Sequence, residues 1–359
     1  MSNRRRRLVR EKRPLRVGFV TLSLGRGGAE RWILTLCKSF SKRIDVTGII
    51  TWDLQGDLAQ EARTLTRLFH PHETEEFFSG CDVVIAWGVM LSEVRGIKEF
   101  KGKIVACSHG SSLQPFHRKT NADMASIPGC VLTAVSDAAA LSFPAGCDVT
   151  VIPNGVELER CSPRLGRRNT RGLLGIPEDA KVALFFARIA AEKRPLLLAD
   201  AILNMEGWYA VFAGIDYEGI GEKLPKHERI IHLEPQENPG DLLSAADCFV
   251  LPSNTEAHPL ALTEAWVAGV PTVYCDWGFA DQIRGTYGED FGEVIPVEFS
   301  QWELEEAIQR SQSGKHTHKA RDTAWKDFTS TAMAARWEHF LGVPTPDFRR
   351  VCKPPPTVG

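Results

Sequence analysis

Two basic residues in the second half of the chain have the type and spacing to bind a diphosphate. Arg188 follows the apolar run 182–187, which predicts a strand, and Lys193 stands five residues further on, where a helix is expected to begin. A planar guanidinium can bind two phosphate oxygens at once, whereas an ammonium acts as a point charge. A solvated charged loop would contain the same residues, so the pair alone leaves both interpretations open.

Two carboxylates flank the predicted start of another helix. Glu256 precedes this helix, Pro259 suits its first turn, and Glu264 lies more than a turn inside it. The start of a helix favours a phosphate, and Glu264 could accept hydrogen bonds from a ribose diol. Ordinary carboxylates on the surface of a helix are the alternative.

The first half of the chain offers a glycine-rich turn and a histidine. Gly27 and Gly28 lie between a predicted strand and a predicted helix, where free backbone N–H groups favour a phosphate. The dinucleotide pattern G-x-G-x-x-G is not met, because Glu30 occupies the position of the third glycine. His109 follows a predicted strand, at the edge where doubly wound sheets bind ligands. Steric and structural roles for these residues remain open.

Alternating strands and helices must position these residues. Short apolar strands alternate with helices in two sets, as is typical of doubly wound parallel sheets covered on both faces. Helices are expected at 29–40, 195–205 and 260–268. The predicted strands are 16–22, 46–51, 83–87, 103–108 and 131–135 in the first set, and 182–187, 209–213, 230–233, 248–251 and 272–275 in the second.

The length of 359 residues predicts two domains rather than one. Residues 153–171 contain Pro and Gly without clear periodicity, so we predict an interdomain linker there. The expected segments are a basic disordered tail (1–13), a first domain (14–158), a second domain (159–322), a helix over about 323–341 that packs back on the first domain, and a Pro-rich tail (342–359).

The composition excludes several classes of protein. Residues 1–16 hold seven Arg and one Lys against one Glu, yet the net charge is −2, so the rest of the chain is acidic and nucleic-acid binding is not expected. The nine cysteines include no C-x-x-C pair, which indicates reduced thiols and a cytoplasmic protein. The longest apolar run, 83–91, is too short to span a bilayer.

The basic run Arg4–Arg7 leaves three interpretations open. A solvated tail, a peripheral contact with anionic lipid and a nucleic-acid arm all suit such a run.

Taken in order, the motifs resemble those of the retaining nucleotide-sugar glycosyltransferases of family four, which have the GT-B architecture. Residues 27–31 match the motif GGAER, and 151–156 match IPNGV. Arg188 with Lys193 matches R-x4-K, and Glu256 with Glu264 matches E-x7-E. The motifs keep the order of the family over residues 14–341. The resemblance implies an α/β fold of two Rossmann-like domains that face a cleft, with the acceptor bound by the first domain and the donor by the second.

The resemblance also implies a role for each candidate residue. The catalytic group would be His109 at the donor sugar, Arg188 and Lys193 at the departing diphosphate, and Glu256 at the hexose. The donor-binding group would be Gly27 and Gly28 near the diphosphate, the backbone amides of Leu260 and Ala261 at the phosphates, Glu264 at the ribose, and His258, which replaces a common Phe, in sugar selectivity. Ala187 and Arg194 stand where the family often has glycine.

The implied reaction moves a sugar from a nucleoside-diphosphate sugar to an acceptor with retention of configuration. UDP is the favoured nucleotide and GDP is possible; the acceptor could be a glycan, a lipid-linked sugar or a small molecule. Such enzymes generally need no metal, and the chain contains no Asp-x-Asp, so no metal or other cofactor is expected. The alternatives are an inactive nucleotide-sugar-binding regulator and a sugar-nucleotide epimerase or phosphorylase on the same architecture.

Overall fold

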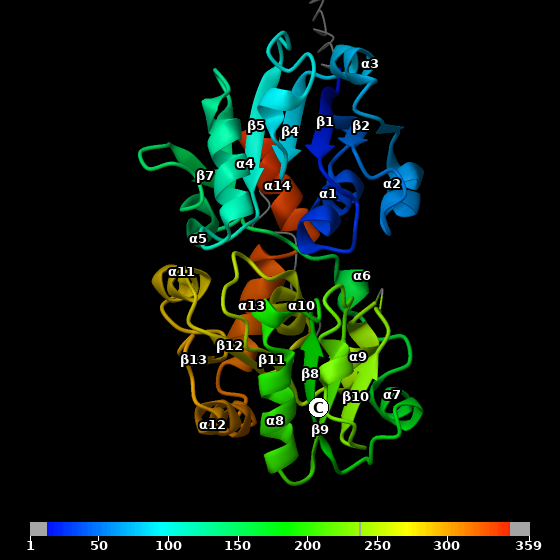
Figure 1. Ribbon diagram of the computed structural model, residues 1–359, viewed down its shortest axis with the longest axis vertical. Coiled ribbons are helices and arrows are strands. Elements are labelled where there is room, and N and C mark those ends of the chain that lie inside the picture. The colour runs from blue at the N-terminus through cyan, green and yellow to red at the C-terminus, as the bar shows by residue number, and fades with distance from the viewer. Residues whose placement is uncertain (1–12, 237, 345–359) are drawn as a thin grey trace, which may run out of the picture.

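The computed structural model describes residues 13–236 and 238–344, which form two α/β domains (Figure 1). Each domain is built on one sheet in which all strands pair in parallel, as the sequence predicts. The first sheet has the order β3-β2-β1-β4-β5-β6-β7 and the second β10-β9-β8-β11-β12-β13. The basic run Arg4–Arg7 and most of the Pro-rich tail lie outside the described residues.

The ten predicted strands are all present, with ends that differ by at most two residues. Three further strands lie at sheet edges and contain two or three residues each, too few to give a periodic signal. The strands are β1 (Leu15–Thr21), β2 (Ile44–Thr51), β3 (Leu68–Phe69), β4 (Val83–Trp87), β5 (Lys103–Ser108), β6 (Val131–Ala134), β7 (Val149–Val151), β8 (Lys181–Phe186), β9 (Trp208–Ala213), β10 (Ile230–Leu233), β11 (Cys248–Leu251), β12 (Thr272–Cys275) and β13 (Glu293–Ile295).

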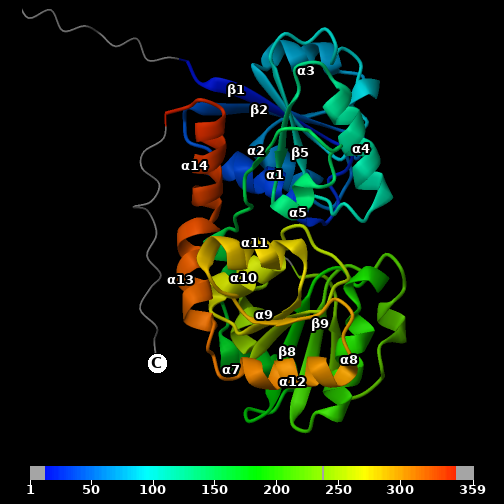
Figure 2. The same cartoon turned by 90° about the vertical axis from the view of Figure 1, so that its left-hand side faces the viewer.

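Helices cover both faces of each sheet, so the central strands are almost fully buried (Figures 1 and 2). The helices of the first domain are α1 (Gly28–Ser39), α2 (Ala59–Leu65), α3 (Thr74–Gly80), α4 (Pro115–Ser126) and α5 (Asp137–Ala140). Those that follow are α6 (Leu158–Cys161), α7 (Arg167–Leu173), α8 (Pro195–Asn204), α9 (Gly240–Ala245), α10 (Leu260–Ala268), α11 (Gly278–Tyr287), α12 (Gln301–Ser311), α13 (Thr317–Asp327) and α14 (Ser330–Phe340). The short 3-10 helices are η1 (Leu91–Glu93), η2 (Ala191–Lys193) and η3 (Gly221–Lys223).

The predicted linker over 153–171 is wrong in its second part, because α6 and α7 form there. Arg171 of α7 is buried, and its guanidinium donates to the carbonyl of Ala245 and to Asp247 at 2.6 Å. These bonds attach α7 to the second domain. The sequence suggested a linker because the segment contains Pro and Gly without clear periodicity, whereas the structure forms two short helices there and pairs the charge of Arg171 with Asp247.

The predicted helix over 323–341 is also wrong in one respect, because two helices form instead. The break falls at Thr329, whose hydroxyl caps α14 by accepting from the backbone N–H of Ala332. Val156 pairs with Thr329 in a parallel bridge, and Gly155 lies against the carbonyl of Thr329. The chain therefore crosses between the domains twice, at neighbouring points.

The two C-terminal helices pack on different domains (Figure 2). Helix α13 packs on α10 of the second domain, and α14 packs on α1 of the first. The ring of Trp337 on α14 lies 5.5 Å from that of Trp32 on α1. The last described helix therefore completes the core of the domain that begins the chain.

Candidate active site

A cavity of about 970 Å³ lies between the two domains. It opens at the carboxyl ends of both sheets, where the loops after β1, β5, β8, β9 and β11 meet. Parallel strands bring these loops to one edge of each sheet, which is why residues far apart in sequence converge. All of the site residues named from the sequence line this cavity: Gly27, Gly28, His109, Arg188, Lys193, Glu256, His258, Leu260, Ala261 and Glu264.

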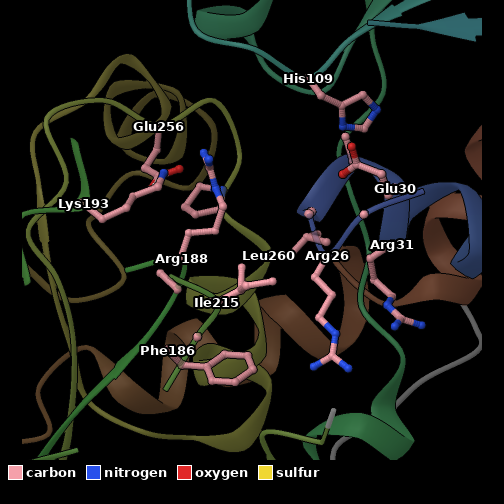
Figure 3. Close-up of a pocket in the computed structure, with 18 of the residues that line it drawn as sticks. Arg26, Glu30, Arg31, His109, Phe186, Arg188, Lys193, Ile215, Glu256 and Leu260 are labelled. Carbon is pink, nitrogen blue, oxygen red and sulfur yellow. The ribbon is translucent and has the colours of Figure 1, made fainter. Parts of the chain in front are cut away.

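Lys193 and Glu256 form a close ion pair on the second-domain wall (Figure 3). Lys193 Nζ lies 2.7 Å from Glu256 Oε1, and only 12% and 11% of the two side chains are exposed. The hydroxyl of Ser253 donates to the same Glu256 oxygen at 2.8 Å. Because water is largely excluded, this pair is fixed more firmly than a surface ion pair.

Arg188 contacts a carboxylate that also reaches the other domain. Its Nη2 lies 2.8 Å from Glu192 Oε1, while Glu192 Oε2 accepts a hydrogen bond from Gln114 Nε2 at 2.7 Å. A second bond across the cavity joins the hydroxyls of Thr255 and Ser111 at 2.6 Å. The domains are thus linked directly at the rim of the cavity.

His109 lies on the first-domain wall, between aromatic neighbours. Its ring centroid is 4.3 Å from that of Trp32 and 5.8 Å from that of Trp87. Burial, with smaller effects from His258 and His117, lowers the pKa of His109 to about 3. The imidazole is therefore neutral at neutral pH and can exchange hydrogen bonds with a sugar hydroxyl without adding charge.

Glu30 is a residue of the cavity that sequence reasoning missed. It lies in the first turn of α1, beside His109 (Figure 3), and burial raises its pKa to about 7. A Cβ at Gly27 would come within 2.1 Å of Glu30 Oε2, so the glycine leaves room for this carboxyl group. The sequence presented Glu30 as the residue that breaks the dinucleotide pattern and as part of the GGAER match, without a role of its own.

Glu264 is almost fully buried and lines the cavity. Burial raises its pKa, and Arg160, whose Nε lies 3.2 Å from Glu264 Oε1, acts in the opposite direction. Arg160 also lines the cavity, but the sequence placed it in the supposed linker. Nearby, Leu260 and Ala261 begin α10, so its first turn faces the cavity.

His258 is buried at the boundary between the domains. Its Nδ1 lies 3.3 Å from both the backbone N of Asn154 and the carbonyl oxygen of Val135, and its ring stacks on Phe279 at 4.4 Å. These contacts hold the two domains together. An effect of His258 on sugar selectivity therefore remains a prediction, and its ring contacts favour a structural role.

Within the described part of the chain, no group of three or more His, Cys, Asp or Glu side chains is arranged to hold a metal ion. No helix in that same part is both long and apolar enough to cross a membrane.

The two facing parallel-sheet domains, with the cavity between them, define the GT-B architecture. The solved structure of Anabaena Alr3699/HepE in complex with UDP and glucose has the same fold, with a TM-score of 0.77 over 91% of this chain and 99% of that chain. The sequence identity is 18%, so this likeness concerns the fold alone.

Residues 166–324, somewhat under half of the chain, match the family described as glycosyl transferases group 1. A D-inositol 3-phosphate glycosyltransferase of Kineococcus radiotolerans is 32% identical over 174 residues, which make up 41% of this chain and 40% of that protein. The UDP-Gal:alpha-D-GlcNAc-diphosphoundecaprenol alpha-1,3-galactosyltransferase of Escherichia coli is 28% identical over 139 residues, or 35% of this chain and 36% of that protein. The chain thus spans less than half the length of the curated relatives it matches.

Proposed function

We propose that the protein is a retaining glycosyltransferase that takes a sugar from a nucleoside-diphosphate sugar. The observation that carries this proposal is the convergence of Arg188, Lys193 and the glycine-rich start of α1 on one cavity between the domains. Cations and helix starts are groups that bind a diphosphate, and fixed cations stabilise the charge that builds on it as it leaves.

The contacts of Glu256 support front-face substitution, in which no carboxylate acts as the nucleophile. Retaining glycosidases use two carboxyl groups about 5 Å apart, one as the nucleophile. Here Glu256 is held by Lys193 and Ser253, an arrangement suited to orienting the sugar. In the proposed reaction the leaving phosphate takes the proton of the acceptor hydroxyl, and the new bond forms on the face that the phosphate leaves.

UDP is the nucleotide we favour, with GDP as the second candidate. The names of the Escherichia coli relative and of the Anabaena structure both contain UDP. The names of the relatives include an undecaprenol-linked sugar and an inositol phosphate, so a glycan, a lipid-linked sugar and a small molecule all remain candidate acceptors. Metal independence and a cytoplasmic location are part of the proposal.

Thermal stabilisation by UDP-, GDP-, ADP- and TDP-sugars, with and without EDTA, tests the donor site. A ligand at about 100 times its Kd adds about 2.7 kcal/mol of stability, which is readily measured as a higher Tm. One nucleotide that stands out and is unaffected by EDTA supports the proposal; no shift with any of them contradicts it. Binding without turnover favours the regulator, and conversion of the sugar without an acceptor favours the epimerase.

Peripheral membrane contact through Arg4–Arg7 is a separate part of the proposal. Sedimentation with anionic liposomes, with and without residues 1–13, tests it. Loss of binding on truncation supports the lipid contact, and equal partitioning of the two proteins rules it out.

A further inference from the structure

Arg194 has an unusual backbone next to Lys193, although its own side chain does not line the cavity. Its φ of 52° and ψ of 45° place it in the left-handed region, and no other non-glycine residue in the described chain has a positive φ. Residues with a Cβ avoid this region, and the following Pro195 disfavours the right-handed alternative. Such a conformation persists only where the surrounding structure fixes it.

The guanidinium of Arg194 provides that fixation. Its Nε donates to the carbonyl oxygen of Pro252 at 2.6 Å, and its Nη2 lies 3.3 Å from both the carbonyl oxygen of Ser253 and Cys275 Sγ. The group also lies over the ring of Phe299, 4.6 Å from its centroid. A planar fork can hold several acceptors at fixed angles, and here it joins the segments that follow β8 and β11 to the end of β12.

The same segments carry the buried ion pair of the cavity. Ser253, whose carbonyl contacts Arg194, donates its hydroxyl to Glu256, and Glu256 accepts from Lys193. The backbone N–H of Asn254 donates to the carbonyl of Glu192 at 2.8 Å, so the two segments are also joined through their backbones. Arg194 therefore holds together the two segments whose side chains meet in the cavity.

We propose that Arg194 is a positioning residue that holds the Lys193 ammonium against the Glu256 carboxylate. This inference rests on the proposed function, since it gives the contacts of Arg194 a role in the transfer reaction. A glycine at this position would adopt the left-handed backbone without strain, but it would lack the guanidinium and its contacts. In this chain the arginine accepts that strain and fixes the loops through its side chain.

The first test compares kcat, KM and Tm of Arg194→Gly and Arg194→Lys with those of wild type. The glycine variant relieves the strain and removes the fork, while the lysine variant keeps the charge without the fork. We expect kcat to fall at least tenfold in both, with less than a twofold change in the KM for the donor. The exposed Arg310→Lys variant is the matched control and keeps the wild-type kcat. A wild-type kcat in Arg194→Gly overturns the proposal.

A combined variant separates positioning from general destabilisation. If Arg194 acts through Lys193, adding Arg194→Gly to Lys193→Ala lowers kcat no further, because both changes remove the same contribution. If Arg194→Gly lowers kcat by the same factor in the wild-type and the Lys193→Ala backgrounds, Arg194 acts independently of Lys193. That result contradicts the proposal.

A last measurement does not depend on catalysis. The coupling between Lys193 and Glu256 is measured from the unfolding of Lys193→Met, Glu256→Gln and the double variant, in the wild-type and Arg194→Gly backgrounds. We expect the coupling to fall by at least half without Arg194, and an unchanged coupling overturns the positioning role. If the coupling falls but the wild-type protein transfers no sugar to any acceptor, the proposed function is wrong, and Arg194 still positions Lys193 against Glu256.

Discussion

The two cations proposed to bind the diphosphate each contact a carboxylate. Arg188 contacts Glu192, which is shared with Gln114, whereas Lys193 is buried against Glu256. The side chain of Arg188 is 45% exposed and that of Lys193 only 12%. Arg188 is therefore the more adaptable of the two, and Lys193 the more firmly preorganised.

Replacing Arg188 with Ala is expected to lower kcat about 100-fold, because a positioned charge at the leaving group typically contributes that much. Steady-state turnover with the donor found in the thermal screen measures the effect. Arg310→Ala, which removes an exposed arginine outside the cavity, serves as the control and is expected to retain wild-type turnover. Equal turnover in the two variants would show that Arg188 does not stabilise the leaving group.

The Glu30 carboxyl group predicts a pH dependence of donor binding. Its pKa of about 7 means that it is neutral below that pH and negative above it. A negative charge in the cavity repels a diphosphate, so donor affinity is expected to fall as pH rises through about 7. Calorimetric Kd values between pH 6 and 8.5 measure this trend.

Glu30→Gln is expected to bind the donor with nearly constant affinity over the same range. The exposed Glu99→Gln provides the matched control and keeps the wild-type pH profile. An identical decline in wild type and Glu30→Gln would assign the titration to another group or to the ligand.

At the scale of elements, the crossover between the domains depends on one close backbone approach. Gly155 lies against Thr329, where the chain breaks between α13 and α14. A Cβ at Gly155 would come within 2.1 Å of the Thr329 carbonyl oxygen, and backbone cannot move aside as a flexible side chain can. The break between the two helices and the glycine of the IPNGV motif therefore belong to one structural feature.

Gly155→Ala is expected to lower the free energy of unfolding by about 2 kcal/mol, as overpacking of a tight site does. Gly172→Ala on α7 is the control, because nothing lies within 4 Å of the added Cβ and alanine favours a helix. Urea unfolding should show a loss for the first variant and no loss for the second. Equal stability of the two variants would contradict the close approach.

At the scale of the whole molecule, the cavity exists only because two domains meet. The hydrogen bonds Gln114–Glu192 and Ser111–Thr255 cross it directly, and His258 and the two chain crossings also join the domains. A cavity with direct bonds across its rim suits a protein whose domains part to admit a ligand and close to exclude water.

Gln114→Ala combined with Thr255→Val removes both bonds at the rim. Each is worth about 1 kcal/mol, so the balance between open and closed forms is expected to shift toward the open form by more than tenfold. Small-angle X-ray scattering should then give a larger radius of gyration without donor and the wild-type value at saturating donor. An unchanged radius without donor would mean that these bonds do not control closure.

Most of the fold could be predicted from the sequence because its cause is local. Continuous apolar runs predict buried parallel strands, and glycine or proline marks where they end. The edge strands β3, β7 and β13 carry no such run. Helix α7 is mostly polar, and the hydrogen bonds that hold it come from the second domain. The sequence did not predict the break at Thr329, because the residue that pairs with Thr329, Val156, is distant in sequence.

The sequence by itself determined two parallel-sheet domains and named ten residues that the structure gathers around one cavity. It could do so because the loops after parallel strands must lie at one edge of the sheet. Only the tertiary structure decided which of those residues touch. The pairing of Lys193 with Glu256, the buried carboxyl group of Glu30 and the contacts of Arg194 all depend on segments far apart in the chain. Burial raises the pKa of Glu30 and keeps most water away from the Lys193–Glu256 pair, and burial is a property of the assembled fold.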